Sequence, residues 1–277
     1  MLSRGCEFVA MKRKALEKMK EWMDSPDRKP LILEGARQVG KTWLMQEFGR
    51  LYFEDIVLFN FDKREDLKAI FKVSKEVDRI VKQLSLIRGK AIEPKKTLII
   101  FDEIQECPEA LNSLKYFKED GNEYFVVTAG SLLGVYLAQG HAHPVGQVNI
   151  IDVYPMSFEE FLEAVNPTIY TFYSQIRKGD AIEEIFHNQL VDAYKEYLII
   201  GGLPECVMAW IETKDPAKVA QLHDELGRIY ERDFVKHHGK VDPERILMIY
   251  KYSCTARKRE QQICLWRYSE RCTGPKL

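Results

Sequence analysis

The chain has 277 residues, which is enough for one large domain or two small ones. Hydrophobic residues make up 45% of it and charged residues 30%, a composition typical of a soluble globular protein. Because 41 basic residues face 42 acidic ones, the formal net charge of -1 does not support nucleic acid as a partner, although it leaves room for a local basic patch.

The cysteine pattern and the absence of long apolar runs bear on where the protein works. Six cysteines are scattered without a C-x-x-C pair, which favours reduced thiols over disulfides or a zinc site. No apolar run reaches the ~20 residues that a membrane-spanning helix needs. The first ten residues lack the apolar core of a signal peptide. We therefore expect a cytoplasmic protein with no membrane partner.

The first predicted element is a helix over residues 11–23, whose apolar side chains fall on one face while most of its lysines avoid that face. Short apolar runs then predict buried strands, and periodic segments between them predict helices. The strands are expected at residues 30–35, 56–62, 97–103 and 123–130, with a fifth within 149–158. The helices are expected at residues 42–52, 67–86 and 110–120.

The order of these elements predicts the fold class. Strands that are apolar along their whole length and alternate with helices indicate a parallel sheet covered on both faces. After residue 157 the strand pattern fades, and groups such as Phe158, Phe161 and Leu162 mark helices instead. We therefore predict an α/β fold with a mainly parallel sheet flanked by helices, followed by a smaller, mostly helical region.

The stretch GARQVGKTW, between the first strand and the next helix, predicts a phosphate-binding loop and hence a P-loop NTPase. It fits the pattern G-x-x-x-x-G-K-[ST], in which loop amides and a helix N-terminus bind phosphate. Lys41 is expected to reach the β- and γ-phosphates of ATP, and the Thr42 hydroxyl to bind Mg²⁺. The alternative is a glycine-rich turn without a ligand. The residues predicted to contact ATP are Gly35, Ala36, Arg37, Gln38, Val39, Gly40, Lys41, Thr42 and Trp43.

A pair of carboxylates at the end of the third strand, in LIIFDE, predicts the second half of this site. Asp102 is expected to hold Mg²⁺ through water, and Glu103 to act as general base on the attacking water. Two solvated charges at a strand end are the alternative. The pair gains weight because it lies sixty residues after a complete phosphate loop.

Polar residues at two other strand ends are weaker candidates. Thr128, at the end of the fourth strand, is expected to sense the γ-phosphate or position the water, and Ser131 is a lesser candidate. Either residue could instead simply end a strand or cap a helix. Asp62, after the second strand, could face the site or lie in a turn.

Several motifs together resemble those of bacterial and archaeal ATPases with an AAA-type domain, in the branch that carries an additional catalytic glutamate. They are RKPLILEGARQVGKTWLMQEF, LIIFDEIQECPEAL, VVTAGSLL, YPMSFEEFL and GGLPECV, and the resemblance covers residues 11–252. It implies an AAA-like core that hydrolyses ATP with Mg²⁺, followed by a C-terminal domain of unknown function that is sometimes compared with nucleases. The cellular role stays open, and a homo-oligomer or a protein partner is compatible with it.

Two departures from this family's pattern matter. Gln147, within HPVGQVN, stands where similar sequences tend to carry a basic residue, so we name no arginine finger. The family's members also continue for well over a hundred residues beyond the last residue here. Residues 253–277 lack helical or strand periodicity, which predicts a disordered basic arm or, as a sharper hypothesis, a shifted reading frame in which NNKFVYGVI would continue a strand. Met11 is a plausible true start of the chain, since the resemblance begins there.

The domains expected from pattern and resemblance are an N-terminal helix over 1–28, an AAA-like ATP-binding domain over 29–156, a helical region over 157–252 and a disordered or frameshifted tail over 253–277. The leading function is a magnesium-dependent ATPase, and the alternative is a nucleotide-dependent switch with slow or no turnover. A P-loop kinase is disfavoured because no arginine-rich lid follows residue 130. A DNA-processing role is disfavoured because residues 157–230 are acidic on balance, and a chain cut short could also lack stable activity.

Overall fold

The computed structural model describes residues 11–62, 64–130, 146–236 and 242–252. It divides into two compact units, Met1–Val219 and Ala220–Leu277, which are treated separately below. The first unit contains the sheet and the helices that follow it as far as Val219. The change from α/β to helical structure expected near residue 157 therefore occurs inside the first unit.

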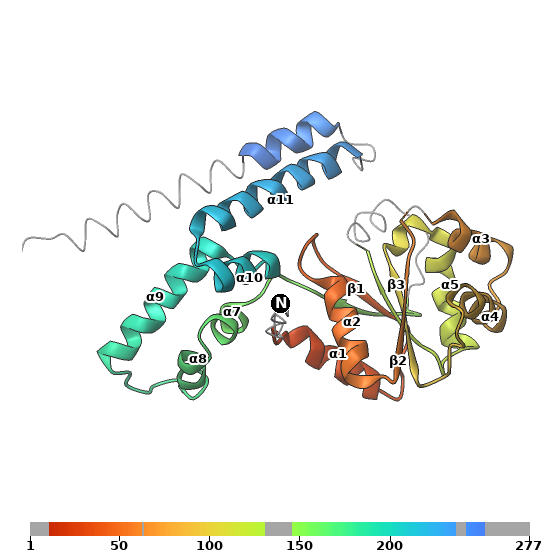
Figure 1. Ribbon diagram of the computed structural model, residues 1–277, viewed down its shortest axis with the longest axis horizontal. Helices are drawn as coiled ribbons and strands as arrows, with labels where there is room; N and C mark the ends of the chain where they lie inside the picture. The colour runs from red at the N-terminus through yellow and green to blue at the C-terminus, as the bar shows by residue number, and fades with distance from the viewer. Residues whose placement is uncertain (1–10, 63, 131–145, 237–241, 253–277) are drawn as a thin grey trace, which may run out of the picture. The chain divides into compact units, whose positions relative to one another are not determined.

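The centre of the first unit is a five-stranded sheet in the order β2-β3-β4-β1-β5, with every neighbouring pair parallel. The predicted α/β fold with a parallel sheet is thus confirmed (Figure 1). The strand β4 lies between β1, which precedes the predicted phosphate loop, and β3, which ends at Asp102. The strands are β1 (Leu31–Glu34), β2 (Asp55–Asn60), β3 (Thr97–Asp102), β4 (Phe125–Ala129) and β5 (Asn149–Asp152).

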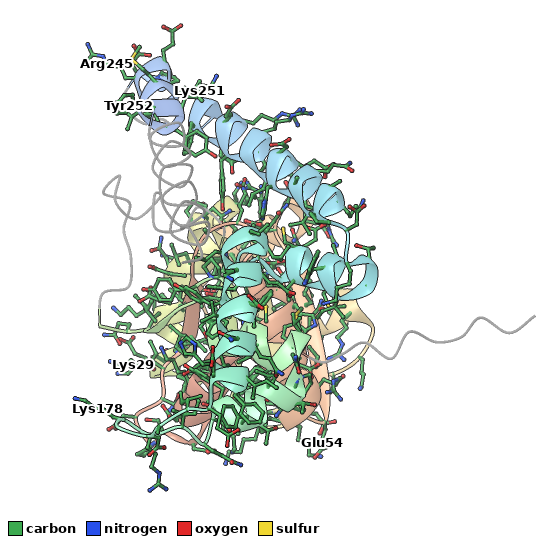
Figure 2. The ribbon with its side chains drawn as sticks, turned by 90° about the vertical axis from the view of Figure 1, so that its left-hand side faces the viewer. Lys29, Glu54, Lys178, Arg245, Lys251 and Tyr252 are labelled. Atoms are coloured by element: carbon green, nitrogen blue, oxygen red, sulfur yellow. The ribbon has the colours of Figure 1, made fainter. Side chains whose placement is uncertain are left out.

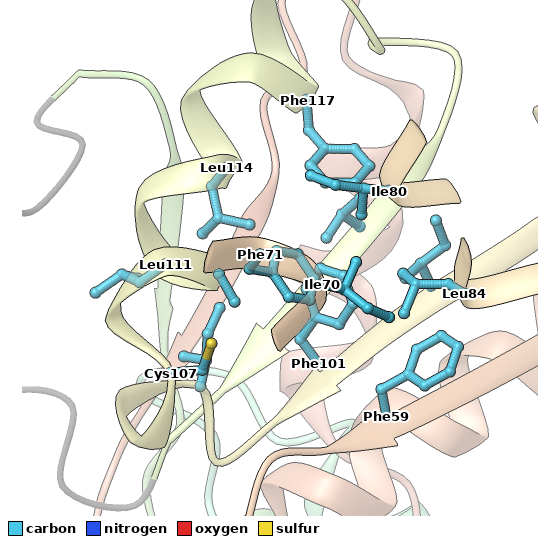
Figure 3. Close-up of a cluster of buried hydrophobic side chains, with 14 of the residues drawn as sticks. Phe59, Ile70, Phe71, Ile80, Leu84, Phe101, Cys107, Leu111, Leu114 and Phe117 are labelled. Atoms are coloured by element: carbon cyan, nitrogen blue, oxygen red, sulfur yellow. The ribbon is translucent and has the colours of Figure 1, made fainter. Parts of the chain in front are cut away.

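Helices cover both faces of the sheet, as continuously apolar strands require. On one face, α1 (Lys14–Asp24) and α2 (Lys41–Tyr52) bury Trp22 and Phe48 against β1, β3 and β4. On the other face, α3 (Glu65–Val73), α4 (Val77–Arg88) and α5 (Pro108–Glu119) enclose Phe101, which Figure 3 shows among side chains of all three helices. Figure 1 shows the two sets of helices on opposite sides of the strands.

The single helix predicted over residues 67–86 is two helices, α3 and α4. Ser74 ends α3 in an extended conformation, with φ at -160°, and its hydroxyl accepts a hydrogen bond from the backbone N–H of Glu76 at 3.1 Å. A serine side chain that binds a backbone N–H two residues ahead offers the chain an alternative to helix. Apolar periodicity on both sides of the break hid it in the sequence.

The helical part of the first unit begins at a capping box. The Ser157 hydroxyl accepts from the Glu160 N–H at 3.3 Å, and the Glu160 carboxylate accepts from the Ser157 N–H at 2.8 Å. This reciprocal pair satisfies two N–H groups that would otherwise lack partners. The helices are α7 (Phe158–Val165), α8 (Pro167–Tyr173), α9 (Glu184–Ile200) and α10 (Pro204–Thr213), as the helical pattern after residue 157 predicts.

The second unit, as far as it is described, is a pair of helices. It holds most of α11 (Pro216–Lys236) and a helix over residues 243–252. Tyr250 packs edge-on against Phe234 with ring centroids 5.2 Å apart, and Lys251 pairs with Glu231 at 3.8 Å. Figure 2 labels Lys251 and Tyr252 near the end of the second helix. The tail over residues 253–277, and with it the reading-frame hypothesis, lies outside the described residues.

Within the described residues, no helix combines the length and the apolar character that crossing a membrane would require.

Candidate nucleotide-binding site

The loop between β1 and α2 turns so tightly that its first glycine is required. A Cβ on Gly35 would lie 2.1 Å from the carbonyl oxygen of Val153, which follows β5. The Val153 N–H in turn donates to the carbonyl oxygen of Glu34 at 2.6 Å. The start of the loop is therefore pressed against the backbone beside the sheet's edge strand, and only glycine fits there.

The rest of the loop has the backbone conformation that binds anions. Gln38 and Gly40 have φ values of 62° and 91°, both in the left-handed region. Alternating right- and left-handed residues direct successive N–H groups into one concavity, and such nests bind phosphate. Gly40 is also the N-cap of α2 and has no side chain to cap it, so the positive end of the helix faces the loop. Val39 contributes only its backbone, since its side chain is fully buried in the core.

Lys41 lies folded inside this loop. Its ammonium donates to the carbonyl oxygens of Gly35 and Ala36 at 2.6 and 2.7 Å. Burial lowers the pKa of Lys41, while the charges of Glu103 and Asp102 act in the opposite direction. A cation on a loop of inward-directed N–H groups makes the concavity strongly attractive to phosphate.

The Thr42 hydroxyl and the Asp102 carboxylate meet next to the loop. Thr42 Oγ1 donates to Asp102 Oδ2 at 3.1 Å, and Asn60 Nδ2 donates to the same oxygen at 3.3 Å. One hydroxyl and one carboxylate, both hard oxygen donors, fit Mg²⁺, which usually takes few protein ligands and keeps water and phosphate oxygens as the others. The donor set therefore matches the predicted Mg²⁺ site at Thr42 and Asp102.

Asp102 is buried at the end of β3, and its environment acts on its charge in two directions. Burial raises its pKa as the largest effect, and the neighbouring Glu103 charge adds to this rise. The hydrogen bonds from Thr42, from the Glu103 N–H and from Asn60 oppose it. A bound cation would favour the ionised form of this carboxylate.

Glu103 follows Asp102 in an unusual backbone conformation. Its φ is 51°, in the left-handed region that non-glycine residues rarely adopt, and such residues cluster at functional sites. Its Oε2 accepts a hydrogen bond from Gln105 Nε2 at 2.6 Å. The Gln105 Oε1 is buried and has no hydrogen-bond partner among the described residues. The amide of Gln105 therefore fixes the orientation of the carboxylate predicted to be the general base.

Thr128, one of the weaker candidates, does not lie beside Asp102 and Glu103 in the structure. Thr128 lies in register with Ile32 and Phe101, whose side chains belong to the face covered by α3, α4 and α5. Because successive residues of a strand alternate between faces, Thr128 points away from the face on which Asp102 meets Thr42. Its hydroxyl is buried without a hydrogen-bond partner in the described part of the chain, and its sensor role stays a prediction.

Two further candidates lie in other surroundings, and a third is outside the described residues. Asp62 is exposed in a turn after β2, where its N–H donates to Asn60 Oδ1 at 2.8 Å. Trp43, at the end of the predicted ATP-binding stretch, is half-buried and packs against the core beneath α1 and α2. Ser131 is not among the described residues.

Sequence reasoning missed three residues that the structure brings to the site. Asn60 binds the Asp102 carboxylate, and its position at the end of an apolar strand was the available signal. Arg13 donates to the Val39 carbonyl oxygen in the loop at 3.0 Å and pairs with Glu160 at 3.2 Å. Nothing local in the sequence marks Arg13 or Glu160, since they lie 147 positions apart.

Comparison with known proteins identifies the domain that carries this geometry. A family model described as an AAA domain matches residues 27–162. This AAA domain makes up just under half of the 277-residue chain. A second model, a domain of unknown function (DUF8612), matches residues 191–268. The resemblance to AAA-type P-loop ATPases with a C-terminal domain of unknown function is thus confirmed.

Curated relatives extend the match but name no activity. One uncharacterized protein of Methanocaldococcus jannaschii is 26% identical over 211 residues, covering 75% of this chain and 42% of the relative. Another from the same organism is 25% identical over 254 residues, covering 85% of this chain and 50% of the relative. The chain thus spans about half the length of these relatives.

Two solved structures align with most of the chain. A Walker-type ATPase of Pyrococcus abyssi aligns with a TM-score of 0.47 and 16% identity, over 79% of this chain and 75% of that one. The RuvB Holliday junction branch migration motor of Thermotoga maritima aligns at 0.42 and 14%, over 73% of this chain and 61% of that one. Both TM-scores are low, so the assignment of the AAA domain rests on the family match and on the sheet order of this chain.

Proposed function

We propose that the AAA domain binds Mg-ATP at residues 35–43 and hydrolyses it to ADP and phosphate. The observation that carries this proposal is the meeting of Thr42 Oγ1 and Asp102 Oδ2 at 3.1 Å, beside a loop with the conformation of a phosphate nest. Residues sixty positions apart supply the hydroxyl and the carboxylate that a nucleotide-bound Mg²⁺ needs. A glycine-rich turn without a ligand would give no reason for this convergence.

On binding ATP, Lys41 would exchange its hydrogen bonds to the protein backbone for hydrogen bonds to the phosphates. Lys41 would leave the carbonyl oxygens of Gly35 and Ala36 and donate to phosphate oxygens, which restores its charge-assisted hydrogen bonds. Thr42 and Asp102 would hold Mg²⁺, directly or through water. Bound Mg²⁺ supplies neutralisation of the charge that develops on the β- and γ-phosphate oxygens. Asn60 would keep the Asp102 carboxylate in its orientation throughout.

Glu103 would supply the proton acceptor for the reaction. A water attacks the γ-phosphorus, its O–P bond forms as the bond to the ADP oxygen breaks, and Glu103 takes the proton that the water loses. The Gln105 amide would hold the carboxylate in place through its 2.6 Å hydrogen bond. The strained backbone at Glu103 costs about 1 kcal/mol or more, and it directs the side chain differently from a regular strand end.

The same contact favours the second candidate, a nucleotide-dependent switch with slow turnover. The Glu103 oxygen engaged by Gln105 is an oxygen that a general base would otherwise turn to water. In a switch, this contact would persist while ATP is bound. Turnover therefore separates the two functions, whereas nucleotide binding is common to both.

The test compares Glu103→Gln with the parent protein. Glutamine keeps the shape and the contact to Gln105 but cannot accept the proton, so phosphate release should fall by about 10²-fold or more. Calorimetric affinity for Mg-ATP should change little, because the phosphate loop is untouched. Equal turnover in the two proteins would mean that a group other than Glu103 accepts the proton. No turnover in a parent that binds ATP tightly would favour the switch.

A further inference from the structure

Arg13 is a buried cation that no step of the proposed reaction uses. It precedes α1, lies outside the residues matched by the AAA family model, and has a side chain only 3% exposed. Its guanidinium donates to three acceptors in three directions: the Val39 carbonyl oxygen at 3.0 Å, the Tyr154 carbonyl oxygen at 2.7 Å and Glu160 Oε1 at 3.2 Å. A rigid fork of five N–H groups suits such a set, and a lysine ammonium does not.

The contact to Val39 bears directly on the phosphate loop. In a trans peptide the C=O and the N–H point in opposite directions, so the Val39 carbonyl fixes the direction of the Gly40 N–H. With the Val39 carbonyl turned to Arg13, the Gly40 N–H points away from Arg13. Gly40 has φ at 91° and no Cβ, so this peptide would otherwise rotate easily.

Glu160 holds Arg13 in this position. Its Oε1 also accepts from the Lys14 N–H at 2.8 Å, and its Oε2 closes the capping box with the Ser157 N–H. The carboxylate therefore ties together the segment before α1, the first turn of α7 and, through Arg13, the phosphate loop. The Arg13 guanidinium also lies 3.5 Å from the place where a Cβ on Gly40 would be, so it is packed against the loop.

We propose that Arg13 is a positioning residue for the phosphate loop. It holds the Val39–Gly40 peptide so that the Gly40 N–H faces the β-phosphate, and Glu160 keeps the guanidinium in place. This proposal rests on the proposed nucleotide-binding function. It differs from a purely structural role, in which the buried Arg13–Glu160 pair only joins the segment before α1 to α7.

The decisive variants separate loop geometry from stability. Arg13→Lys keeps the charge near Glu160 but cannot reach Val39 and Tyr154 as well, so affinity for ADP should fall about tenfold with the loss of an oriented donor. Arg13→Met combined with Glu160→Gln removes both charges and keeps a residue that the capping box accepts. If Arg13 positions the loop, this double variant should fold, and its affinity for ADP should nevertheless be lower than that of the parent protein.

The matched control is Lys12→Gln. Lys12 joins the same two segments through an exposed ion pair with Glu163 at 2.6 Å, and no hydrogen bond links it to the loop residues that the structure describes. Its loss should leave ADP affinity at the parent value. ADP affinity is measured by calorimetry at a temperature where thermal unfolding shows every variant to be folded.

Amide hydrogen exchange without nucleotide gives a second readout. In Arg13→Lys, exchange should quicken in the peptide that contains Gly40 and stay unchanged in peptides of α5. Two results would overturn the positioning role while leaving the proposed function intact. One is a folded double variant that binds ADP as tightly as the parent, and the other is an exchange rate at Gly40 in Arg13→Lys equal to that of the parent. A parent protein that binds no ADP would instead refute the proposed function, and the positioning role with it.

Discussion

The stability of the fold should depend on pH through the buried carboxylate of Asp102. Burial raises its pKa in the folded protein above the unfolded value of ~3.9. The folded state therefore binds the proton more tightly than the unfolded state. The contribution of this group to stability is complete below about pH 4 and is lost as the pH rises through the raised pKa.

We predict that Asp102→Asn removes the decrease in stability that accompanies ionisation of Asp102. In Mg²⁺-free buffer, the free energy of unfolding of the variant minus that of the parent should increase as pH rises above about 4 and then level off. Urea unfolding across this range measures it. Mg²⁺ affinity of the parent should rise over the same range, since the cation needs the ionised carboxylate. A stability difference that stays constant with pH would show that Asp102 does not titrate as its burial implies.

Gly35 should tolerate no side chain. A Cβ there would meet the Val153 carbonyl oxygen at 2.1 Å, and backbone atoms of a sheet edge cannot move aside easily. We predict that Gly35→Ala destabilises the fold by more than about 1 kcal/mol, the scale of the positive-φ penalty alone, and displaces the loop enough to abolish ATP binding.

Gly89→Ala is the control for this substitution. Gly89 also has a left-handed φ, 75°, but no heavy atom lies within 4 Å of the position that its Cβ would take, so only the backbone penalty applies. Thermal unfolding and ATP calorimetry of both variants measure the comparison. If Gly35→Ala behaves like Gly89→Ala, the close approach to Val153 is not a constraint in solution.

At the residue scale, the sequence predicted what is contiguous and missed what is distant. The phosphate loop is a continuous motif with a fixed chemistry, and Asp102 follows an apolar strand, so both could be recognised. Asn60 and Arg13 reach the site only because the fold brings distant segments together. The sensor role of Thr128 stays a prediction, because Thr128 ends a strand near the site but its side chain belongs to the other face of the sheet.

The capping box at the start of α7 connects this helix to the phosphate loop, because its Glu160 also binds Arg13, which donates to Val39 in the loop. Ser157→Ala would remove the acceptor for the Glu160 N–H and loosen the carboxylate that binds Arg13. We predict a loss of about 1 kcal/mol, the usual cost of removing an N-cap side chain. Chemical denaturation measures this loss.

Ser174→Ala serves as the matched control for the capping box. The Ser174 hydroxyl is exposed and donates to the Thr171 carbonyl oxygen at 2.9 Å, so its loss leaves no N–H group without a partner. Its free energy of unfolding should stay close to the parent value. Equal losses from the two serines would mean that the capping box adds nothing to the stability of α7.

Elements were predicted well where one pattern decides them. All five strands overlap the expected apolar runs. The central strands β1, β3 and β4 are buried on both faces and so need apolar residues at nearly every position, whereas the edge strand β5 alternates half-buried and exposed residues. The break between α3 and α4 was missed, because its cause is a local hydrogen bond to a serine side chain and not a change in periodicity. The boundary between compact units at Val219 depends on packing that no local pattern records.

At the scale of the whole molecule, the sheet order explains why the site exists. The phosphate loop follows β1 and Asp102 ends β3, and parallel strands bring their carboxyl ends to one edge of the sheet. Ligands of open α/β sheets bind at this edge. The helices α1 and α2 cover the face on which Thr42 meets Asp102, and Arg13 reaches the same loop from the segment before α1.

The most direct measurement of the central claim is calorimetric titration of the parent and of Lys41→Ala with Mg-ATP. We predict saturable binding to the parent and an affinity at least tenfold lower in the variant, because a charge-assisted contact to phosphate of ~1.5–3 kcal/mol is lost. Thermal unfolding verifies that the variant is folded. Equal affinity in the two proteins, or a folded parent that binds no Mg-ATP, would contradict the claim that residues 35–43 form the nucleotide site.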